Sequence, residues 1–194
     1  MTIVPDFLPR LRAALARHAP ALLEEEGASH AAVAVVVTEE TEGSILFVKR
    51  RERAGDPWSG HAAFPGGHHS ETDDSPAATA ERETEEETGL ALARAGRRLG
   101  QLDDIYPRSI YLPRIIVTPV VFSVPTRLKV SPSEEIERAV WVRVGELLDP
   151  ANRKPFVLAL PGAGGTREFE SIHVAGLVIW GLTERILAQL SAWA

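Results

Sequence analysis

Three glutamates near the middle of the chain have a spacing that could bind metal ions. Glu83, Glu86 and Glu87 stand three and four positions apart, and on an α-helix this spacing places their carboxylates on one face. Such carboxylates repel one another, and Arg82, which can pair with Glu86 at i+4, supplies only one positive charge. Oxygen ligands suit Mg²⁺ or Mn²⁺. The pattern therefore predicts a divalent metal site, and a solvated acidic helix face is the alternative.

The residues around these glutamates mark a helix from about Pro76 to Thr88. Ser75 is a favourable N-cap residue, and proline suits the first helical position. Gly89 follows the last helical residue and is a typical C-terminal stop. The helix should therefore hold the three carboxylates in a fixed order along one face.

The segment from Phe64 to Leu90 closely resembles the Nudix box. A Phe-Pro-Gly-Gly loop that ends at Gly67 precedes a spaced acidic residue, then Arg-Glu and Glu-Glu-Thr-Gly-Leu. The positions that match the box are Arg82, Glu83, Thr84, Glu86, Glu87, Gly89 and Leu90. The loop is one residue longer than the usual pattern, so the spaced acid falls on Asp74 when counted back from Arg82 and on Asp73 when counted forward from Gly67.

The resemblance implies a fold and a set of roles. It implies an α/β fold, a Nudix-type α/β/α sandwich with a mixed β-sheet plus N-terminal and C-terminal helices. One Nudix hydrolase domain would cover residues 1–194, with residues 1–28 as an N-terminal helical extension. By analogy the metal ligands are Glu83, Glu86 and Glu87, with a backbone oxygen of Gly66 or Gly67 and with Asp73 or Asp74 as the outer acid. Arg82 would orient a glutamate.

The general base varies within the family and often lies on a separate loop. Glu134 and Glu135, in a Ser-Pro-Ser-Glu-Glu loop, are the candidates for this role. An ordinary loop acid or a helix cap is the alternative interpretation. Either glutamate would take a proton from a water that metal ions have made more acidic.

The substrate pattern lies mostly outside the box. An apolar strand that ends in Arg51, nine residues before Gly60, is similar to the coenzyme A pyrophosphatase branch, and this likeness runs from about residue 31 to 190. Glu52, Asp56 and His61 depart from that branch. The residues that could bind its phosphates are Lys49, Arg50, Arg51, Arg53, Gly66 and Gly67. A strand end exposed to solvent is the alternative for the basic cluster. His68 and His69 could contact phosphate or water, with exposed loop histidines as the alternative. Trp58, Tyr106 and Tyr111 could stack on a base, with structural packing as the alternative.

The implied reaction is metal-dependent cleavage of coenzyme A or acyl-coenzyme A to 3′,5′-ADP and (acyl-)phosphopantetheine. ADP-ribose, NADH or a nucleoside triphosphate are alternative substrates within the same family. A Nudix module that binds a nucleotide without turnover is an alternative of another class, and so is a structural protein with an acidic helix.

Apolar periodicity predicts the elements that must position these residues. Residues 6–26 read as an amphipathic helix, kinked or divided at Pro20 and stopped at Gly27. A closing helix should run from about Gly176 to Trp193. The predicted strands are Ala31–Val37, Ser44–Lys49, Arg98–Asp103, Ile115–Val124, Ala139–Val144, Pro155–Leu160 and Arg167–His173. Their irregular alternation with helices favours a mixed sheet with flanking helices.

Composition limits the class of protein. A chain of 194 residues fits one domain, its net charge of −6 argues against broad nucleic-acid binding, and it contains 0 cysteines, which excludes disulfides and thiolate chemistry. The sequence shows neither a signal peptide nor a run long enough to span a membrane. We therefore expect a cytoplasmic protein with a small-molecule, nucleotide-type substrate, and apolar residues on the terminal helices could support a homodimer.

Overall fold

The computed structural model describes residues 6–53, 59–107, 113–159 and 165–192. Its main feature is a seven-stranded mixed sheet in which the order β3-β2-β1-β6-β5 is extended by β4 on β1 and β7 on β2. Only the pairing of β1 with β6 is parallel among the pairs given for this sheet. Its strands are β1 (Ser29–Thr38), β2 (Ser44–Arg50), β3 (Ala62–Ala63), β4 (Gly66–His68), β5 (Arg97–Gln101), β6 (Ile115–Val124) and β7 (Ile136–Arg143).

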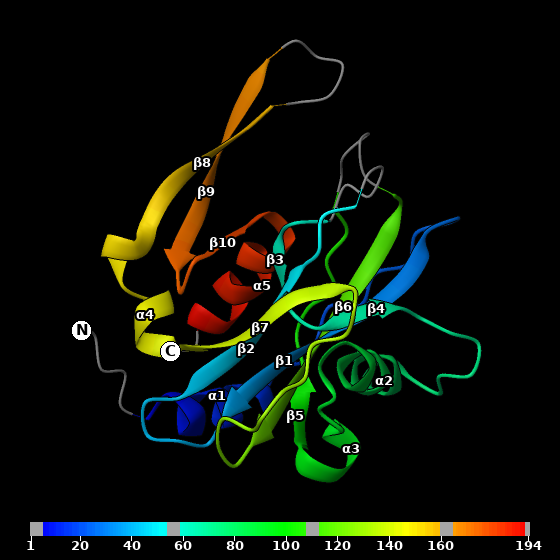
Figure 1. The fold of residues 1–194 in the computed structure, drawn as a ribbon. Coiled ribbons are helices and arrows are strands. Elements are labelled where there is room, and N and C mark those ends of the chain that lie inside the picture. Colours follow the sequence, from blue (N-terminus) through cyan, green and yellow to red (C-terminus); the bar gives the residue numbers. More distant parts are fainter. Residues whose placement is uncertain (1–5, 54–58, 108–112, 160–164, 193–194) are drawn as a thin grey trace.

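Helices cover both faces of this sheet, so the predicted sandwich is confirmed (Figure 1). The two central strands β1 and β6 are apolar almost throughout and are buried on both faces, as expected for a parallel pair inside a sandwich. Alternate residues of β1 enter different cores: Val35 and Val37 join one apolar cluster, whereas Ala34 and Val36 join the other. The helices are α1 (Phe7–Leu15), α2 (Pro76–Thr88), α3 (Leu92–Ala95), α4 (Val144–Leu147) and α5 (Gly181–Ser191), with a 3₁₀ turn at Pro150–Asn152.

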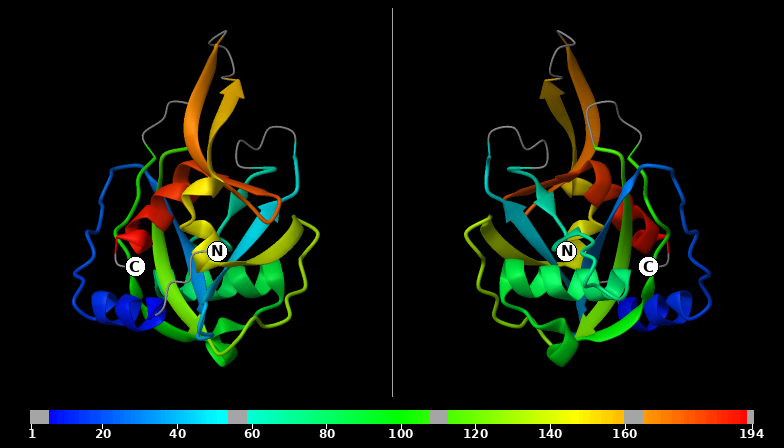
Figure 2. Two further views of the ribbon diagram at one scale, coloured as in Figure 1. Left: turned by 90° about the vertical axis from the view of Figure 1, so that its left-hand side faces the viewer. Right: turned by 90° about the vertical axis from the view of Figure 1, so that its right-hand side faces the viewer.

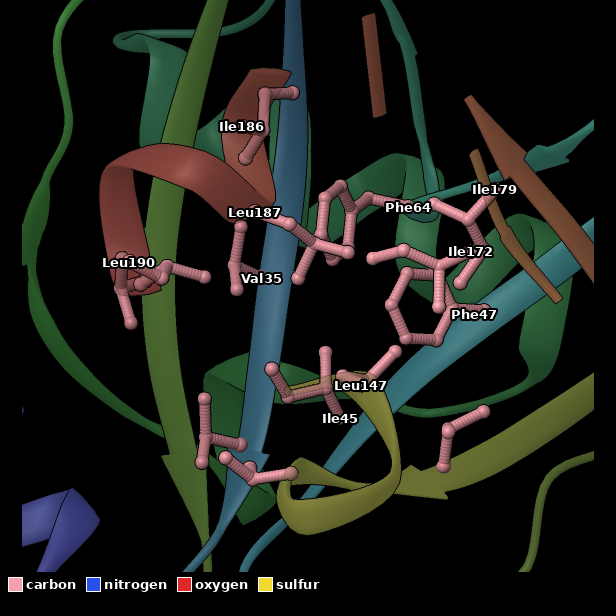
Figure 3. Close-up of a cluster of buried hydrophobic side chains, with 14 of the residues drawn as sticks. Val35, Ile45, Phe47, Phe64, Leu147, Ile172, Ile179, Ile186, Leu187 and Leu190 are labelled. Carbon is pink, nitrogen blue, oxygen red and sulfur yellow. The ribbon is translucent and has the colours of Figure 1, made fainter. Parts of the chain in front are cut away.

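The larger core lies between the sheet and the terminal helices. Figure 3 shows Phe47 and Phe64 stacked beside side chains of α4, α5 and the C-terminal strands, and the two rings are 4.9 Å apart. On the other face of the sheet, α2 contributes only small side chains, Ala77 and Ala80, to the second cluster. Because these side chains are small, the acidic helix packs close to β1 and β4.

A second, three-stranded sheet follows the main one. Its strands β8 (Arg153–Ala159), β9 (Thr166–Val174) and β10 (Leu177–Trp180) are antiparallel and run in the order β10-β9-β8. The β8–β9 hairpin stands out beyond the rest of the molecule, while β10 lies beside β3 of the main sheet (Figures 1 and 2). The two predicted strands of the hairpin are therefore confirmed.

The predicted helix over residues 6–26 was wrong in its second half. The helix ends at Leu15, well before Pro20, and residues 18–25 form no helix. The Asp103 and Asp104 carboxylates accept hydrogen bonds from the amides of Ala21 (2.8 Å) and Leu23 (3.0 Å). These distant partners satisfy backbone groups that a helix would otherwise pair internally.

The predicted closing helix was wrong in its first turn. Residues 177–180 form β10, which pairs with β9, and the helix starts at Gly181. Gly181 has φ 63°, a left-handed conformation that interrupts a right-handed helix and separates the strand from α5. The short strands β3 and β4 were also not anticipated in the Gly- and Pro-rich loop.

The terminal helices bury the apolar residues that suggested a dimer. Phe7, Leu11 and Leu15 of α1 are buried in the core, as are Ile186, Leu187 and Leu190 of α5. Across the described ranges, the exposed large apolar side chains are Leu22, Leu23 and Val157, none of which lies on these helices. The homodimer therefore stays a prediction, and the apolar residues of the terminal helices do not support it. Among the helices of the described ranges, none has the length and apolar character needed to cross a membrane.

Candidate functional site

The acidic helix α2 has the bounds that its capping residues predict. The Ser75 hydroxyl accepts a hydrogen bond from the Ala78 amide (3.2 Å), and Pro76 stands at the first turn. At the other end Gly89 adopts φ 69° and its amide donates to the Glu85 carbonyl. Thr84, the departure from the Nudix pattern, is fully buried, and its hydroxyl donates to the Ala80 carbonyl at 2.6 Å. The polar side chain is therefore satisfied inside the helix.

Two glycines of β4 bring the preceding loop into contact with the carboxylates. A Cβ atom on Gly67 would lie 2.4 Å from Cδ of Glu83, so a larger residue there would displace the Glu83 carboxylate. The Gly66 amide donates to Oε2 of Glu87 at 3.1 Å. A Cβ on Gly66 would lie 2.3 Å from the carbonyl oxygen of Ala32 in β1. Both predicted loop glycines are thus placed against the predicted ligands by close backbone packing.

Arg82 links the carboxylates of α2 to the loop before it. Its Nη1 donates to Glu83 at 2.8 Å and to Glu86 at 3.2 Å. Its Nε and Nη2 each donate to one oxygen of Asp73 at 3.0 Å, and Nη2 also donates to the His68 carbonyl at 3.0 Å. Such two-pronged pairing fixes both partners. The guanidinium therefore has an organising position at the centre of the cluster.

The structure distinguishes the two candidates for the outer acid by position. The side chain of Asp73 is only 5% exposed and accepts further hydrogen bonds from the Ser70 amide and the Thr79 hydroxyl. Hydrogen bonding from Arg82, partly opposed by burial, holds the pKa of the Asp73 carboxyl well below its usual range. Asp74 is exposed to solvent. Asp73 therefore occupies the place from which an acid can orient Arg82.

Thr79 is a residue of this network that the sequence did not indicate. It is fully buried, donates to Asp73 at 2.9 Å, and its hydroxyl lies 3.0 Å from Nδ1 of His69. In the sequence it stands between alanines on the apolar side of the helix, where a threonine reads as a packing residue. Its link to Asp73 depends on how the loop folds back.

Glu87 is the buried acid of the site. It is 7% exposed, and burial raises the pKa of its carboxyl to about 7. The Gly66 amide and the positive charge of Arg50 act in the opposite direction, while the nearby charges of Glu83 and Glu135 raise the pKa further. A carboxylate in this position lacks full compensation for its lost hydration.

The donor set fits a hard divalent cation after a limited side-chain movement. Across the described ranges, no group of three or more Asp, Glu or His side chains is gathered as a metal site, because Glu83 and Glu86 face Arg82. The side chain of Glu86 is 58% exposed and can rotate at low cost, whereas Glu83 and Glu87 are held beside the glycines. Oxygen donors and an undercompensated buried carboxylate suit Mg²⁺ or Mn²⁺.

The loop that carries the candidate general bases docks on the end of α2. The Ser133 amide donates to the Glu87 carbonyl at 2.9 Å, and the Ser131 amide donates to the Thr88 carbonyl at 2.7 Å. Glu135 is close enough for its charge to act on Glu87. Glu134 contributes its backbone carbonyl, which accepts from Nε of Arg51 at 2.9 Å. Of the two candidates, the structure places the Glu135 carboxylate beside the acidic cluster.

The predicted basic cluster is divided between the site and the neighbouring loop. Arg50 lies near Glu87 and acts on its pKa. Arg53 pairs with Glu135 (3.1 Å), and Lys49 pairs with Glu137 (2.6 Å). Arg51 donates from its Nε to the Glu134 carbonyl and from its backbone amide to the Glu135 carbonyl. Arg50, and Arg53 through Glu135, therefore lie beside the acidic cluster, whereas Lys49 is paired with β7 and Arg51 with the backbone of residues 134 and 135.

The remaining candidates fall in different places. His68 is exposed, and the Tyr106 hydroxyl accepts from Nε of Arg114 at 3.2 Å, so this tyrosine has a structural contact. His61 packs edge-on against Trp180. The predicted roles of Asp56, Trp58 and Tyr111 concern positions outside the described residues.

Comparison with known proteins identifies the family. Residues 28–160 match the sequence model of the NUDIX domain, which is more than half of the chain. The chain therefore belongs to the Nudix family. An uncharacterized protein of Schizosaccharomyces pombe is 36% identical over 110 residues, which is 55% of this chain and 33% of that protein. This chain thus matches only about a third of the yeast relative's length.

Solved structures agree with the fold. A MutT/nudix family protein from Enterococcus faecalis has a TM-score of 0.52 and 17% identity, covering 92% of this chain and 71% of its own. The NUDIX domain of Shewanella oneidensis NrtR, in complex with ADP ribose, has a TM-score of 0.50 and 18% identity, covering 70% of this chain and 84% of its own. At these identities the likeness shows the fold, an α/β architecture with a mixed sheet and flanking helices.

Substitution of the two loop acids should separate their roles. We expect Asp73→Asn to weaken metal-dependent activity by about tenfold to a hundredfold, because Arg82 loses the charged partner that fixes its orientation. Asp74→Asn, at the exposed neighbouring position, should stay within about twofold of the wild type. Steady-state kinetics with metal titration measures both, and equal losses in the two variants would contradict the assignment.

The raised pKa of Glu87 should make the metal-free protein less stable at higher pH. The ordinary pKa is 4.5 and the folded-state value is about 7, so the unfolded state loses its proton first as the pH rises. The free energy of unfolding therefore falls across this interval, by up to about 3 kcal/mol. Glu87→Gln removes this loss. The free energy of unfolding of the variant, measured relative to wild type, should therefore be higher at about pH 8 than at about pH 5.

Urea unfolding in the presence of a chelator measures this difference. Glu86→Gln is the matched control, because its side chain is 58% exposed and should show no such pH-dependent gain. A stability difference between wild type and Glu87→Gln that does not change with pH would exclude a raised pKa.

Proposed function

We propose that the protein is a metal-dependent pyrophosphohydrolase that cleaves the diphosphate linkage of a nucleoside diphosphate derivative. The observation that carries the proposal is the contact of Gly66 and Gly67 with Glu87 and Glu83 on one face of α2. This contact brings two carboxylates against the glycine backbone in a member of the Nudix family. Family membership and the intact glutamates support an enzyme.

Glu83, Glu86 and Glu87 would hold Mg²⁺ or Mn²⁺, with backbone oxygen from Gly67. Such ions, when bound, polarise phosphoryl oxygens, lower the pKa of a bound water and offset the charge between an acidic protein and an anionic substrate. Asp73 and Arg82 position the ligands, since Arg82 contacts Glu83 and Glu86 directly. Asp73 thus acts through Arg82, whereas Asp74 keeps no part in this scheme.

Glu135 would accept the proton of the attacking water. Its loop is fixed to the end of α2 by two backbone hydrogen bonds, and its charge reaches Glu87. Arg53, which pairs with Glu135 at 3.1 Å, would orient the carboxylate. Arg50 and Arg51 lie on the same side and would bind phosphate oxygens.

Coenzyme A or acyl-coenzyme A is the proposed substrate, with 3′,5′-ADP and (acyl-)phosphopantetheine as products. The support is the sequence likeness that places Arg51 before Gly60 and a longer loop before the helix. Glu52 and His61 depart from that likeness, so ADP-ribose, NADH or a nucleoside triphosphate are the alternatives. The ADP ribose bound by the Nudix domain of NrtR supports the wider class of adenosine diphosphate derivatives.

A nucleotide-binding module without turnover is the second candidate, and the retained Glu83, Glu86 and Glu87 disfavour it. The proposed partner is a small molecule, without nucleic acid or membrane. A cytoplasmic location and a homodimer are further proposals, which cell fractionation and light scattering would test.

A substrate panel should identify the reaction. Coenzyme A, acetyl-coenzyme A, ADP-ribose, NADH and ATP are incubated with the protein and Mg²⁺ or Mn²⁺, and the products are identified by mass spectrometry. We expect 3′,5′-ADP and phosphopantetheine from coenzyme A, and no products in chelator. Cleavage of ADP-ribose without cleavage of coenzyme A would reject the proposed substrate, and no metal-dependent cleavage of any compound would reject the enzyme.

The two loop glutamates should differ in their effect on the chemical step. Glu135→Gln should lower kcat by about a hundredfold or more, as loss of a general base does. Glu134→Gln should leave kcat within about twofold, because this residue contributes a backbone carbonyl. Similar kinetics for the two variants would contradict a base at Glu135.

A further inference from the structure

The second sheet carries aromatic rings on the face opposite to the one that Ile172 and Ile179 bury in the larger core. Trp180 of β10 contacts Phe156 of β8 with ring centroids 5.0 Å apart and Phe169 of β9 at 5.1 Å. Its third neighbour is the His61 ring, at 4.9 Å and in an edge-on arrangement. These four side chains, the aromatic cluster, are half-buried and keep part of their ring surface accessible.

The register of the second sheet places positive charge on the same face as the rings. Phe156 and Phe169 are direct cross-strand partners, and residues two positions away share a face. Lys154 and Arg167 therefore lie on this face, and the Arg167 guanidinium stands 5.1 Å from the Phe169 ring centre. Glu168 and Glu170 belong to the opposite face. The aromatic face is thus suited to a flat, anionic ligand, whereas the opposite face is acidic.

A single segment of backbone connects the aromatic cluster to the carboxylates. The His61 carbonyl accepts from the Arg50 amide at 3.1 Å, and Arg50 is close enough to Glu87 to act on its pKa. Further along the same segment, the Gly66 amide donates to Glu87. The chain makes five residue-to-residue steps from His61 to Gly66, which can span at most about 17 Å. One extended molecule could therefore place its diphosphate at Glu87 and its ring system at the cluster.

The second sheet is also fixed to this segment. The Thr183 hydroxyl, just after β10, donates to the Ala62 carbonyl at 3.1 Å and is buried. This bond holds Trp180 beside His61 while the hairpin extends away from the main sheet (Figure 1). The position of the rings relative to the site is therefore set by contacts at the base of the hairpin.

We propose that the aromatic face of Phe156, Phe169 and Trp180 binds the nucleobase of the substrate by stacking, with Arg167 and Lys154 attracting its phosphate charge. The inference rests on the proposed function, because it takes the diphosphate to lie at the α2 carboxylates. Stacking on aromatic rings accepts any base, and cations beside the rings add to the attraction. The hairpin then supplies affinity for the nucleoside half and takes no part in bond cleavage.

Binding of AMP without turnover tests this site directly. Isothermal titration of AMP into the chelator-treated protein compares wild type with Phe169→Leu, Phe169→Tyr and Val157→Ala. Val157 is the matched control, since it is exposed on the same hairpin and on the opposite face. We expect Phe169→Leu to weaken binding about tenfold, within the range of one lost base stack. Phe169→Tyr, which keeps the ring, and Val157→Ala should both retain the wild-type affinity.

Kinetics with the best compound of the substrate panel distinguish this inference from the proposed function. The KM of Phe169→Leu should rise about tenfold with kcat nearly unchanged, as expected for a group that binds without reacting. Unchanged AMP affinity in Phe169→Leu, or no AMP binding by the wild type, would overturn the inference even if hydrolysis is found. Loss of AMP binding in this variant without any hydrolysis by the wild type would support the aromatic site and reject the enzyme. A thermal melt shows whether each variant is folded, and the tyrosine variant keeps the test valid if the leucine variant is not.

Discussion

The close approach of β4 to α2 is the contact on which the site depends. A Cβ atom on Gly66 would overlap the backbone of β1, and a Cβ atom on Gly67 would overlap the Glu83 carboxylate. This approach lets the Gly66 amide donate to Glu87 and the His68 carbonyl accept from Arg82. Sheet, loop and acidic helix are therefore held in one arrangement by glycines whose missing side chains make room for carboxylates.

The electrostatics of α2 show a site that favours function over stability. Arg82 joins Asp73, Glu83 and Glu86 and offsets much of their repulsion. Glu87, however, is buried with one amide donor and has a raised pKa. A protein without need of a cation there would be more stable with a neutral side chain. A divalent ion would offset the uncompensated negative charge of Glu87. Binding of the proposed cofactor should therefore raise the stability of the fold.

The second sheet lies largely beyond the part of the chain that matches the NUDIX domain, which ends at residue 160. It nevertheless contributes to the larger core through Ile172 and Ile179, and Trp180 contacts His61. Thr183 of the following helix α5 is hydrogen-bonded to Ala62 beside it. The outer part of the second sheet carries rings and cations on one face and acids on the other. On the proposed function, the family fold would supply the diphosphate chemistry, and the second sheet would provide a separate surface that sets substrate preference.

The sequence by itself determined the acidic helix and the central strands. Caps and spacing are local signals, so the bounds of α2, the order of Glu83, Glu86 and Glu87, and the buried strands β1 and β6 could be predicted. The tertiary structure decided what depends on distant partners. Asp73 is distinguished from Asp74 because Thr79 and Arg82 face it, and Glu135 from Glu134 because the charge of Glu135 acts on Glu87. The N-terminal helix stops at Leu15 because carboxylates of Asp103 and Asp104, far along the chain, take the backbone amides that a longer helix would have used.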